Sequence, residues 1–546
     1  MTWIVLAWVF GALLLLIVIF VTICVVLYLC ADFGEPKGIS IDTSTKSNQA
    51  HLYKNRHGLW EAHVKGDALE RGAAYGSLCR DLLEQQEEAF SNRIHEIIPS
   101  KRWVNFLHKV VILFNRNMAR HIPDEYRNEI YAISHSASDK YNNYGSKYVR
   151  QLNYHAAHDI GHAMQKYMLV GCTSFAAWGK SSASGELIVA RNFDFYVGEE
   201  FTKNKMVLFV EPTGGYRFVS LSWPGMIGVV SGMNEHGLTI TLNAIEGAIP
   251  LKSAMPISLL ARHIMQHATT IDEAYAIAKQ FKSFVSESML VASAKDGCAA
   301  IIEKTPKRVG IYRTEQSHIL CANHAQSAEL RHDKHNIKNM ATTDSLYRFE
   351  RLEELVAQHA LIDVVRAADI MRDTRGKGDN DIGLGNEKSI NQFIAFHSVV
   401  FEPTKLRLWV STSPWQFGEY VCYDLGKVFD GSLPRSGSYA LEELNIAADK
   451  VAIESIYPRI LRYRELHTTI SKNINTKRTI DASILGEFEA VNPNFYDTYN
   501  ILGDYYLAVV RDRVRAVEYW RKALGLEIPK QSEREKIIRK IDKYKV

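Results

Sequence analysis

The segment from Trp3 to Cys30 constrains the fold most, because it contains no charged residue. A helix rises about 1.5 Å per residue, so this run would be roughly 42 Å long, more than the ~30 Å hydrocarbon core of a bilayer. A secretory signal has a basic region followed by an apolar core of about 7 to 15 residues. Here no Lys or Arg precedes the apolar run, and the run is much longer. The sequence therefore predicts an uncleaved, single-pass membrane anchor at residues 1–31.

The residues after the anchor say little about its orientation. The flanking charges are only Asp32, Glu35 and Lys37, and the positive-inside rule counts basic residues. An anchor without upstream basic residues, followed by a large C-terminal region, favours placement of that region outside the cytoplasm. Residues 32–50 contain a stretch rich in Ser, Thr and Lys, and we expect a tether that holds the next domain off the membrane.

Composition excludes several classes of protein. Apolar residues make up 47% and charged residues 23% of the 546 residues, which is typical of globular proteins and not of disordered, collagen-like or coiled-coil chains. At about 150 residues per domain, two to four domains are expected. The 65 basic and 61 acidic residues nearly balance, with a formal net charge of +4, so the charge does not indicate a nucleic-acid partner. The 7 cysteines include no CxxC pair, so neither a zinc site of that type nor a dense disulfide framework is predicted.

Periodicity divides the chain after the tether. Residues 51–171 are predicted to be mainly helical, with apolar residues at three- and four-residue spacing in runs such as 80–98. Residues 172–440 contain short β-like segments separated by turn clusters, with helical runs at 256–267 and 345–359. Hairpins, a helical layer and further hairpins predict an α+β sandwich of antiparallel sheets covered by helices.

Residues 441–546 are predicted to be helical again. Seven of these residues resemble the pattern of one tetratricopeptide (TPR-like) helix pair: Tyr499, Leu502, Gly503, Tyr506, Ala516, Trp520 and Ala523. One such unit cannot bury its own apolar face, since about three are usually needed. A helical pair packed on the preceding domain is therefore favoured over a peptide-binding array. A contact with another protein through these helices is possible in the second case.

The most informative stretch is Gly171-Cys172-Thr173-Ser174, taken together with Arg191-Asn192-Phe193-Asp194 further along the chain. The cysteine opens the β-rich region, and a hairpin through Ser184-Gly185 would return Arg191 and Asp194 to its side. A lone cysteine before a strand is most often an apolar filler of the core. The combination of a thiol with a nearby cation and a carboxylate instead indicates a nucleophile.

These two stretches, with Met233-Asn234-Glu235-His236-Gly237-Leu238, Asn243 and Ala322-Asn323-His324, resemble the N-terminal-nucleophile (Ntn) hydrolases. Within them, the sequence resembles the branch of choloylglycine hydrolase, penicillin V acylase and acid ceramidase. It is most similar to the peptidase C45 family of acyl-CoA:6-aminopenicillanic acid acyltransferases, because a long helical pro-segment precedes an internal Gly-Cys. The resemblance covers about residues 59–413 and implies an αββα sandwich, with 51–171 as the pro-segment. Each motif is weak alone, but the four in this order are specific.

The resemblance implies that the chain cleaves itself between Gly171 and Cys172. A thiol with a pKa near 8.5 is only a few per cent thiolate at neutral pH, whereas an α-amine that titrates near 7.7–8.0 can act as its base. An internal cysteine has no such amine, so cleavage would create nucleophile and base in one residue. Glycine at position 171 is expected to allow a strained backbone that brings the thiol onto the preceding carbonyl.

The resemblance also gives roles to four other residues. Asp194 would accept a hydrogen bond from the α-amine and orient it, and Arg191 would favour the thiolate. Asn243 and Asn323 would stabilise the oxyanion of the tetrahedral intermediate through side-chain or backbone donors. The simpler alternative for Asn243 is a turn position.

A further active-site arginine is expected near residue 348. Arg348, in Tyr347-Arg348-Phe349, sits where the family places this arginine, but Arg351 is close enough in sequence to leave the choice open. The simpler alternative for the arginines is ordinary ion pairing at the surface.

Three histidines are candidate metal ligands. His155, His158 and His162 have a spacing that could place them on one face of a helix. No carboxylate or thiol partner is evident in the sequence, so no metal site is predicted, and a zinc hydrolase is only a distant alternative.

The sequence therefore predicts a membrane-anchored, self-processing amidase or acyltransferase that acts on a small amphiphilic N-acyl amide through a Cys172 thioester, without a cofactor. Water as the acceptor gives a hydrolase, and an amine or thioester partner gives an acyltransferase. The sequence does not separate the two, because both share the acyl-enzyme. The alternative is a non-catalytic, membrane-anchored scaffold with the TPR-like tail as its interaction site.

Overall fold

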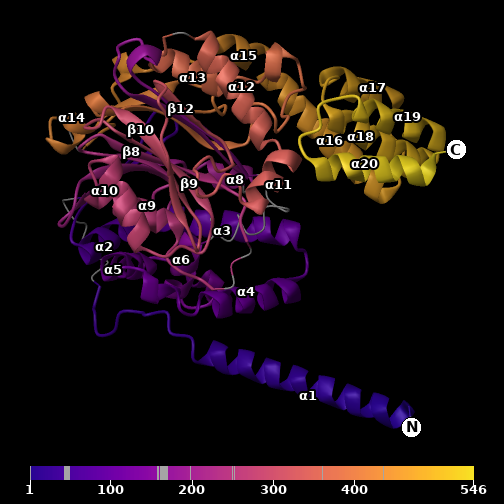
Figure 1. Cartoon of the computed structure of the whole chain (residues 1–546), viewed down its shortest axis with the longest axis horizontal. Coiled ribbons are helices and arrows are strands. Elements are labelled where there is room, and N and C mark those ends of the chain that lie inside the picture. The colour runs from indigo at the N-terminus through magenta and orange to yellow at the C-terminus, as the bar shows by residue number, and fades with distance from the viewer. Residues whose placement is uncertain are drawn as a thin grey trace.

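Two β-sheets packed face to face form the centre of the protein, and helices cover their outer faces (Figure 1). The computed structural model describes residues 2–41, 50–156, 159, 170–196, 198–248, 250, 252–359, 361–433 and 436–545. These ranges include every residue predicted for the catalytic site and leave out part of the predicted tether.

The first sheet has nine strands, and all neighbouring strands are antiparallel except β2 and β5, which are parallel. In sheet order they are β1 (His51–Lys54), β2 (Trp60–Gly66), β5 (Met206–Pro212), β6 (Phe218–Ser222), β7 (Ser231–Asn234), β8 (Leu238–Ala244), β9 (Glu287–Ser293), β10 (Cys298–Lys304) and β11 (Val309–Tyr312).

The second sheet has six strands, all antiparallel to their neighbours. In sheet order they are β12 (His318–Cys321), β3 (Val170–Ala177), β4 (Ile188–Phe195), β13 (Ala395–Glu402), β14 (Arg407–Ser411) and β15 (Tyr420–Asp424). The central strands β3 and β4 carry the cysteine motif and the Arg-Asn-Phe-Asp motif.

Alternation of side chains along each strand explains the layers. Successive side chains point to opposite faces of a sheet, and both faces of these sheets are buried. In β5, Val207 and Phe209 join the core between the sheets, whereas Met206 and Leu208 join the core under the helices of the first sheet. The strands therefore read as nearly continuous apolar runs rather than as alternating ones.

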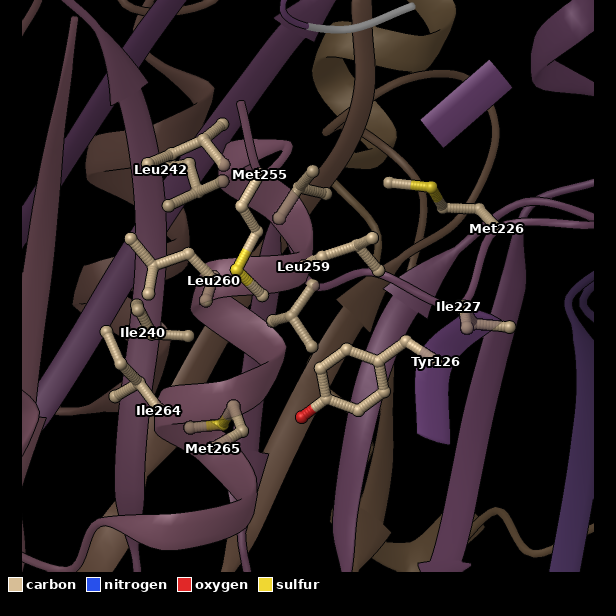
Figure 2. Close-up of a cluster of buried hydrophobic side chains, with 14 of the residues drawn as sticks. Tyr126, Met226, Ile227, Ile240, Leu242, Met255, Leu259, Leu260, Ile264 and Met265 are labelled. Atoms are coloured by element: carbon tan, nitrogen blue, oxygen red, sulfur yellow. The ribbon is translucent and has the colours of Figure 1, made fainter. Parts of the chain in front are cut away.

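Helices form the two outer layers. On the first sheet lie α2 (Ala68–Leu78), α5 (Asp124–Ser134), α9 (Ile257–His267) and α10 (Ile271–Gln280), and on the second lie α12 (Ser345–Gln358) and α13 (Val364–Arg372). Figure 2 shows Ile240 and Leu242 of β8 beside Leu260 and Ile264 of α9. The order of layers is helices, sheet, sheet, helices, and the predicted α+β class is confirmed.

The segment 51–171 differs at its start from the mainly helical prediction. Its first residues form β1 and β2, because β2 pairs in parallel with β5 and so extends the first sheet. The described helices that follow, besides α2 and α5, are α3 (Arg80–Ile97), α4 (Lys101–Asn115) and α6 (Lys147–His155). A partner strand from a distant part of the chain made these strands hard to predict locally.

A buried ion network joins this segment to the rest of the protein. The Glu129 carboxylate of α5 lies 2.7 Å from Arg71 Nη2 in α2 and 2.7 Å from Arg262 Nη2 in α9. Burial alone would raise the pKa of Glu129, but the two guanidinium groups outweigh it and lower this pKa to about 2. The network crosses the predicted cleavage point in sequence, so it can hold the two fragments together.

Replacing Glu129 by glutamine is expected to destabilise the protein by about 3–5 kcal/mol, because it leaves buried guanidinium charges without their shared partner. The native carboxylate, with its lowered pKa, contributes stability that is present above about pH 4.5 and lost as the pH falls towards 2. Urea unfolding at several pH values measures the loss of stability and its pH dependence. Co-purification shows whether the two fragments stay together. Glu88→Gln, which removes an exposed pair with Lys140, is the control, and an equal loss in both variants would contradict the role of the network.

The N-terminal helix α1 (Thr2–Leu29) extends away from the body in Figure 1. Among the described residues it is the one helix long and apolar enough to cross a bilayer, with a mean hydropathy of 3.2 over Phe10–Leu29. A membrane span and a signal sequence both have these properties. The membrane anchor therefore stays a prediction.

The C-terminal region is helical and has its own apolar core. Its helices are α15 (Lys450–Ser455), α16 (Tyr457–Thr476), α17 (Ala482–Val491), α18 (Tyr496–Tyr505), α19 (Arg513–Leu524) and α20 (Gln531–Tyr544). In this core, Gly503 of α18 lies so close to α19 that a Cβ would be 2.4 Å from Trp520 Nε1. The same core continues into the body through Phe393 and Phe417. The likeness to a TPR unit stays a prediction.

Candidate active site

Cys172 lies in β3 beside the returning strand β4. The Cα pairs of this ladder place Gly171 opposite Asp194, Cys172 opposite Phe193, and Ser174 opposite Arg191. Two motifs that are separate in sequence therefore form one site, because a hairpin connects the two strands.

The Cys172 thiol is buried, with 1% of the residue exposed, and it contacts a guanidinium group. Arg191 Nη2 lies 3.3 Å from Cys172 Sγ. Burial raises the pKa of the thiol, and the charge and hydrogen bond of Arg191 lower it only in part. In the uncleaved chain the thiol is therefore protonated at neutral pH, and it requires a base to become a nucleophile.

Arg191 is held by groups that the sequence analysis did not identify. Its Nη1 donates to Val230 O at 2.7 Å and also to Ser231 Oγ. Ser231 Oγ in turn lies 2.8 Å from His397 Nε2, and burial lowers the pKa of His397 well below its usual value. Ser231 and His397 lie in β7 and β13, so only the sheet topology brings them to the site.

Asp194 is a buried carboxyl group without a hydrogen-bond partner among the described residues. Burial raises its pKa to about 7, although Arg348 and Arg191 act in the opposite direction. A carboxyl group that gains and loses its proton near neutral pH is suited to general acid–base catalysis. Its position opposite Gly171 places this group at the predicted scissile residue.

Asn323 and Arg348 bind the backbone of Cys172. Asn323 Oδ1 accepts a hydrogen bond from Cys172 N at 3.0 Å, and Arg348 Nη1 donates to Cys172 O at 2.8 Å. Arg348 Nη2 also donates to Asn323 Oδ1 at 2.6 Å, and its Nε contacts Asp344 at 2.8 Å. Asp344 precedes α12 and belongs to none of the sequence motifs. These contacts fix the residue that would become the new N-terminus.

The structure places Arg348, and not Arg351, against the cysteine. Arg351 points to an acidic cluster, at 2.9 Å from Asp373 Oδ1 and 2.6 Å from Asp379 Oδ1. Both arginines are buried in α12, but only Arg348 contacts Cys172. This contact favours Arg348 over Arg351, and its role as an active-site arginine stays a prediction.

This difference gives a prediction with a matched control. Arg348→Lys is expected to slow cleavage and turnover at least tenfold, because lysine cannot bridge Cys172 O and Asn323 Oδ1 at once. Arg351→Lys removes an arginine of equal burial from the same helix and is expected to retain full cleavage. Both rates are measured from fragment appearance on denaturing gels. Equal slowing in the two variants would assign Arg348 a purely structural role.

Asn243 lies inside β8 and is fully buried, so it does not occupy the turn considered above. Its Nδ2 donates to Cys321 O and Ala322 O, each at 3.2 Å. Its Oδ1 accepts a hydrogen bond from Ser174 Oγ at 3.2 Å. Asn243 therefore contacts the cysteine strand two residues after Cys172.

Glycine is required at position 171 because there is no room for a side chain, and not because the backbone is left-handed. It lies within β3 and does not have a positive φ, so the expected strain is not found. A Cβ at this position would lie 3.0 Å from Gln392 Nε2, which is closer than ordinary van der Waals contact. The absence of a side chain lets the strand pass Gln392, a residue that the sequence analysis did not identify.

The histidine cluster offers no metal site in the described part of the chain. His155 is buried, its Nε2 accepts a hydrogen bond from Ile227 N at 3.1 Å, and its Nδ1 lies 2.8 Å from Gln151 O. Burial lowers its pKa to about 4, so it is neutral. His158 and His162 lie outside the described residues. Within the described ranges, no group of three or more His, Cys, Asp or Glu side chains could hold a metal ion.

A largely apolar pocket lies at Phe195, at the end of the strand that carries Asp194. It lies between helices α3 and α6 of the segment 51–171 and the catalytic sheets, and Phe195 is part of its wall. Its other apolar lining residues are Leu83, Phe90, Phe201, Trp223, Pro224, Gly225 and Met226. The polar residues of the lining are Gln86, Glu87, Gln151, Tyr154 and His155. A mainly apolar lining with a few polar groups is typical of sites for small ligands.

A sandwich of two sheets between helical layers, with a cysteine near the start of a central strand, has the arrangement that the resemblance to Ntn hydrolases implied. The family described as acyl-coenzyme A:6-aminopenicillanic acid acyl-transferase matches residues 181–413, so the resemblance to this branch of the Ntn hydrolases is confirmed. The matched range begins after Cys172 and includes Arg191, Asp194, Asn323 and Arg348.

Three individual proteins are similar to this chain. An uncharacterized protein of Archaeoglobus fulgidus is 24% identical in an alignment of 439 positions, which covers 72% of this chain and 71% of that one. A solved Caenorhabditis elegans N-acylethanolamine-hydrolyzing acid amidase ortholog is 16% identical, with a TM-score of 0.32, over 43% of this chain and 93% of that one. The conjugated bile acid hydrolase of Clostridium perfringens is 11% identical, with a TM-score of 0.34, over 49% and 95%.

Proposed function

We propose that the chain is a self-processing amidase or acyltransferase, which cuts its own Gly171–Cys172 bond and then acts on N-acyl amides through a Cys172 thioester. The observation that carries this proposal is the 3.3 Å contact between Arg191 Nη2 and Cys172 Sγ, in a strand whose pairing sets Asp194 opposite Gly171. Similarity to the acyl-transferase family over residues 181–413 supports chemistry on an acyl group.

In the first step the Cys172 sulfur forms a bond to the Gly171 carbonyl carbon. Asp194, with a pKa near neutrality, is suited to accept the thiol proton and to return it to the Cys172 nitrogen as the carbon–nitrogen bond breaks. The product is a thioester with a free α-amine. Water then hydrolyses the thioester, which leaves a carboxylate on Gly171 and a free thiol on Cys172.

In the second step the new α-amine acts as the base. Asn323 Oδ1 already accepts a hydrogen bond from Cys172 N, and the Asp194 carboxylate is available to a positively charged amine. The thiol transfers its proton to the amine, attacks the carbonyl of an N-acyl amide, and releases the amine product. Water as the acceptor of the thioester gives hydrolysis, and an amine or thiol as the acceptor gives acyl transfer.

Asn243 and Asn323 are proposed to serve the oxyanion. In the uncleaved chain their Nδ2 groups donate to backbone carbonyls, with Asn323 Nδ2 at 2.8 Å from Ala244 O. They would have to release these carbonyls in order to donate to an oxyanion, or else would act by fixing backbone donors. In either role, Asn243 and Asn323 would stabilise the tetrahedral intermediate that leads to the Cys172 thioester.

The substrate is proposed to be a small amphiphilic N-acyl amide, and its acyl group would occupy the apolar pocket beside Phe195. Helix α1 would anchor the enzyme in a membrane, where such substrates gather. Residues 32–50 would form the tether, residues 51–171 the pro-segment, residues 172–440 the catalytic domain, and residues 441–546 the C-terminal helices. No observation favours the non-catalytic scaffold, since the thiol, cation and carboxylate are all present.

A denaturing gel with N-terminal sequencing tests the proposal directly. The purified wild-type protein is expected to run as two fragments, 1–171 and 172–546, and the second should begin with Cys172. The two should co-purify under native conditions, because the Arg71–Glu129–Arg262 network joins them. Active protein that runs only as a single chain of 61.9 kDa would contradict self-processing.

The orientation of the anchor is proposed to place the catalytic domain outside the cytoplasm. Protease added to intact cells or spheroplasts is then expected to digest fragment 172–546 before any cytoplasmic marker protein. Complete protection, with digestion only after lysis, would reverse this orientation. The described cysteines form no disulfide, but a domain of this size is stable without one in an oxidising compartment.

A further inference from the structure

A buried amide from a distant part of the chain lies against the proposed scissile residue. The nearest heavy atom to a Cβ built on Gly171 is Gln392 Nε2, at 3.0 Å. The Gln392 residue is 3% exposed, and its Nε2 has no hydrogen-bond partner among the described residues. An unsatisfied buried donor is unfavourable for folding, so its presence at this place indicates a functional role.

The backbone next to Gln392 is strained. Phe393 has a φ of 57°, in the left-handed region that bulky residues rarely adopt. Asn391 Oδ1 accepts a hydrogen bond from Phe393 N at 3.1 Å and so supports this conformation from inside the loop. Such strain persists only where the surrounding structure imposes it, and it is concentrated at functional sites.

Phe393 is held by one of the C-terminal helices, α16, and by two aromatic rings that precede β15. Arg464 of α16 donates from Nη2 to Phe393 O at 2.6 Å, and its guanidinium group lies 4.7 Å from the centre of the Trp415 ring. The buried Phe393 ring packs against Trp415 and Phe417, with ring centres 5.4 Å and 5.6 Å apart. The peptide group that follows Phe393 is therefore held by a helix of the C-terminal region.

The same loop is fastened at both ends. Leu384 and Asn492 exchange two hydrogen bonds of 2.9 Å, which tie the loop to the residue after α17. On the catalytic side, Asn192 Nδ2 donates to Ile390 O at 3.0 Å. Asn192 stands in β4 between Arg191 and Asp194, so the loop connects the C-terminal helices directly to the strand that carries the site.

We propose that Gln392 is a further catalytic residue of the self-cleavage, and that the C-terminal helices hold it against Gly171 through the left-handed Phe393. The Gln392 amide would donate a hydrogen bond to the Gly171 carbonyl oxygen as negative charge develops there. It transfers no proton: the carbon–sulfur bond forms, the carbon–nitrogen bond breaks, and the thiol proton ends on the Cys172 nitrogen. Phe393 and Arg464 are positioning residues. This inference rests on the self-processing proposed above.

The test follows cleavage in full-length chains made by cell-free synthesis with lipid vesicles. After a radioactive pulse, fragment 172–546 is quantified over time on denaturing gels. Gln392→Leu, which keeps the volume and removes the donor, is expected to cleave at least tenfold more slowly. Asn115→Leu is the matched control, since Asn115 is a fully buried amide with an unpartnered Oδ1 outside the site. It should cleave within twofold of the wild-type rate.

A double-mutant cycle separates direct contact from a general loss of structure. Gly171→Ala should slow cleavage because its Cβ meets Gln392 Nε2. In the presence of Gln392→Ala this contact is gone, so the double variant should cleave no more slowly than Gln392→Ala alone. Residues that act independently would give multiplied rate effects.

Two variants of Phe393 test the positioning. Both Phe393→Ala and Phe393→Gly lose the ring, but glycine adopts a positive φ without cost. Phe393→Gly is therefore expected to cleave at least threefold faster than Phe393→Ala. Equal rates in these two variants would show that the left-handed backbone does not position Gln392.

The outcomes distinguish this inference from the function on which it rests. If the wild-type chain gives no fragment beginning at Cys172, self-processing is wrong and the inference falls with it. If the wild type is cleaved and Gln392→Leu is cleaved at the same rate, only the inference is overturned. Slow cleavage by Gln392→Leu, together with rate effects that multiply in the double-mutant cycle, would also overturn it, because Gln392 would then act without touching Gly171.

Discussion

Replacing Cys172 by alanine is expected to leave the protein as one uncleaved chain without activity. The methyl group cannot form a bond to the Gly171 carbonyl carbon, so neither the thioester nor the new α-amine can arise. Folding should be retained, because a buried Ala occupies the same position in β3 with only a small loss of volume. Denaturing gels measure cleavage, and release of the amine from an N-acyl amide measures turnover.

The matched control for this variant is Cys422→Ala. Cys422 is also fully buried in the second sheet, but it lies in β15, at the far edge from β3 and β12. Burial raises the pKa of its thiol to about 12, so this thiol is unreactive at neutral pH. Normal cleavage and turnover are expected in Cys422→Ala. Cleavage in Cys172→Ala, or a loss in both variants, would contradict the role of Cys172.

The part of the site that lies on one hairpin could be predicted from the sequence. The spacing of the two motifs and the turn at Ser184-Gly185 are local features, and antiparallel pairing then sets Arg191 and Asp194 beside Cys172. The α+β class could also be predicted, since short apolar segments alternate with turn clusters and helical periods in the same chain. Local information therefore sufficed for the centre of the site.

The choice between Arg348 and Arg351 could not be made from the sequence. Residues three apart lie on neighbouring parts of a helix surface, so both arginines of α12 could have faced the cysteine. The decision depends on how α12 packs across β3, which brings Arg348 to Cys172 O and leaves Arg351 to Asp373. A local pattern does not contain this packing angle.

The residues that the sequence did not indicate are joined to the site only by long-range pairing. Ser231 and His397 support Arg191 from two different sheets. Gln392 reaches Gly171 from a loop before β13 and belongs to none of the motifs. The strands β1 and β2 were missed for the same reason, since their partner β5 lies far along the chain. Polar residues of this kind carry no periodic signal, and single buried amides are common in any chain.

Replacing Asp194 by asparagine is expected to lower turnover by at least about 100-fold, in the range of a lost general acid–base group. Asparagine keeps the size of the side chain but cannot accept a proton from the thiol or attract the α-ammonium group. Turnover has to be expressed per mole of free N-terminal Cys172, because the same change also slows processing. Glu61→Gln is the control, since Glu61 is another buried carboxyl group whose pKa is raised by burial, in β2.

The pH dependence distinguishes a base from a structural group at Asp194. Because its pKa in the uncleaved chain is raised to about 7, the fraction of carboxylate, and with it the cleavage rate, should rise as the pH increases through 7. The free energy of unfolding has the opposite pH dependence. The folded precursor holds the Asp194 proton more tightly than the unfolded chain does, so its stability should fall as the pH rises from about 4 to 7. Asp194→Asn should remove both dependences. A wild-type rate in this variant, or an unchanged pH profile, would show that the buried carboxylate opposite Gly171 takes no part in breaking the bond.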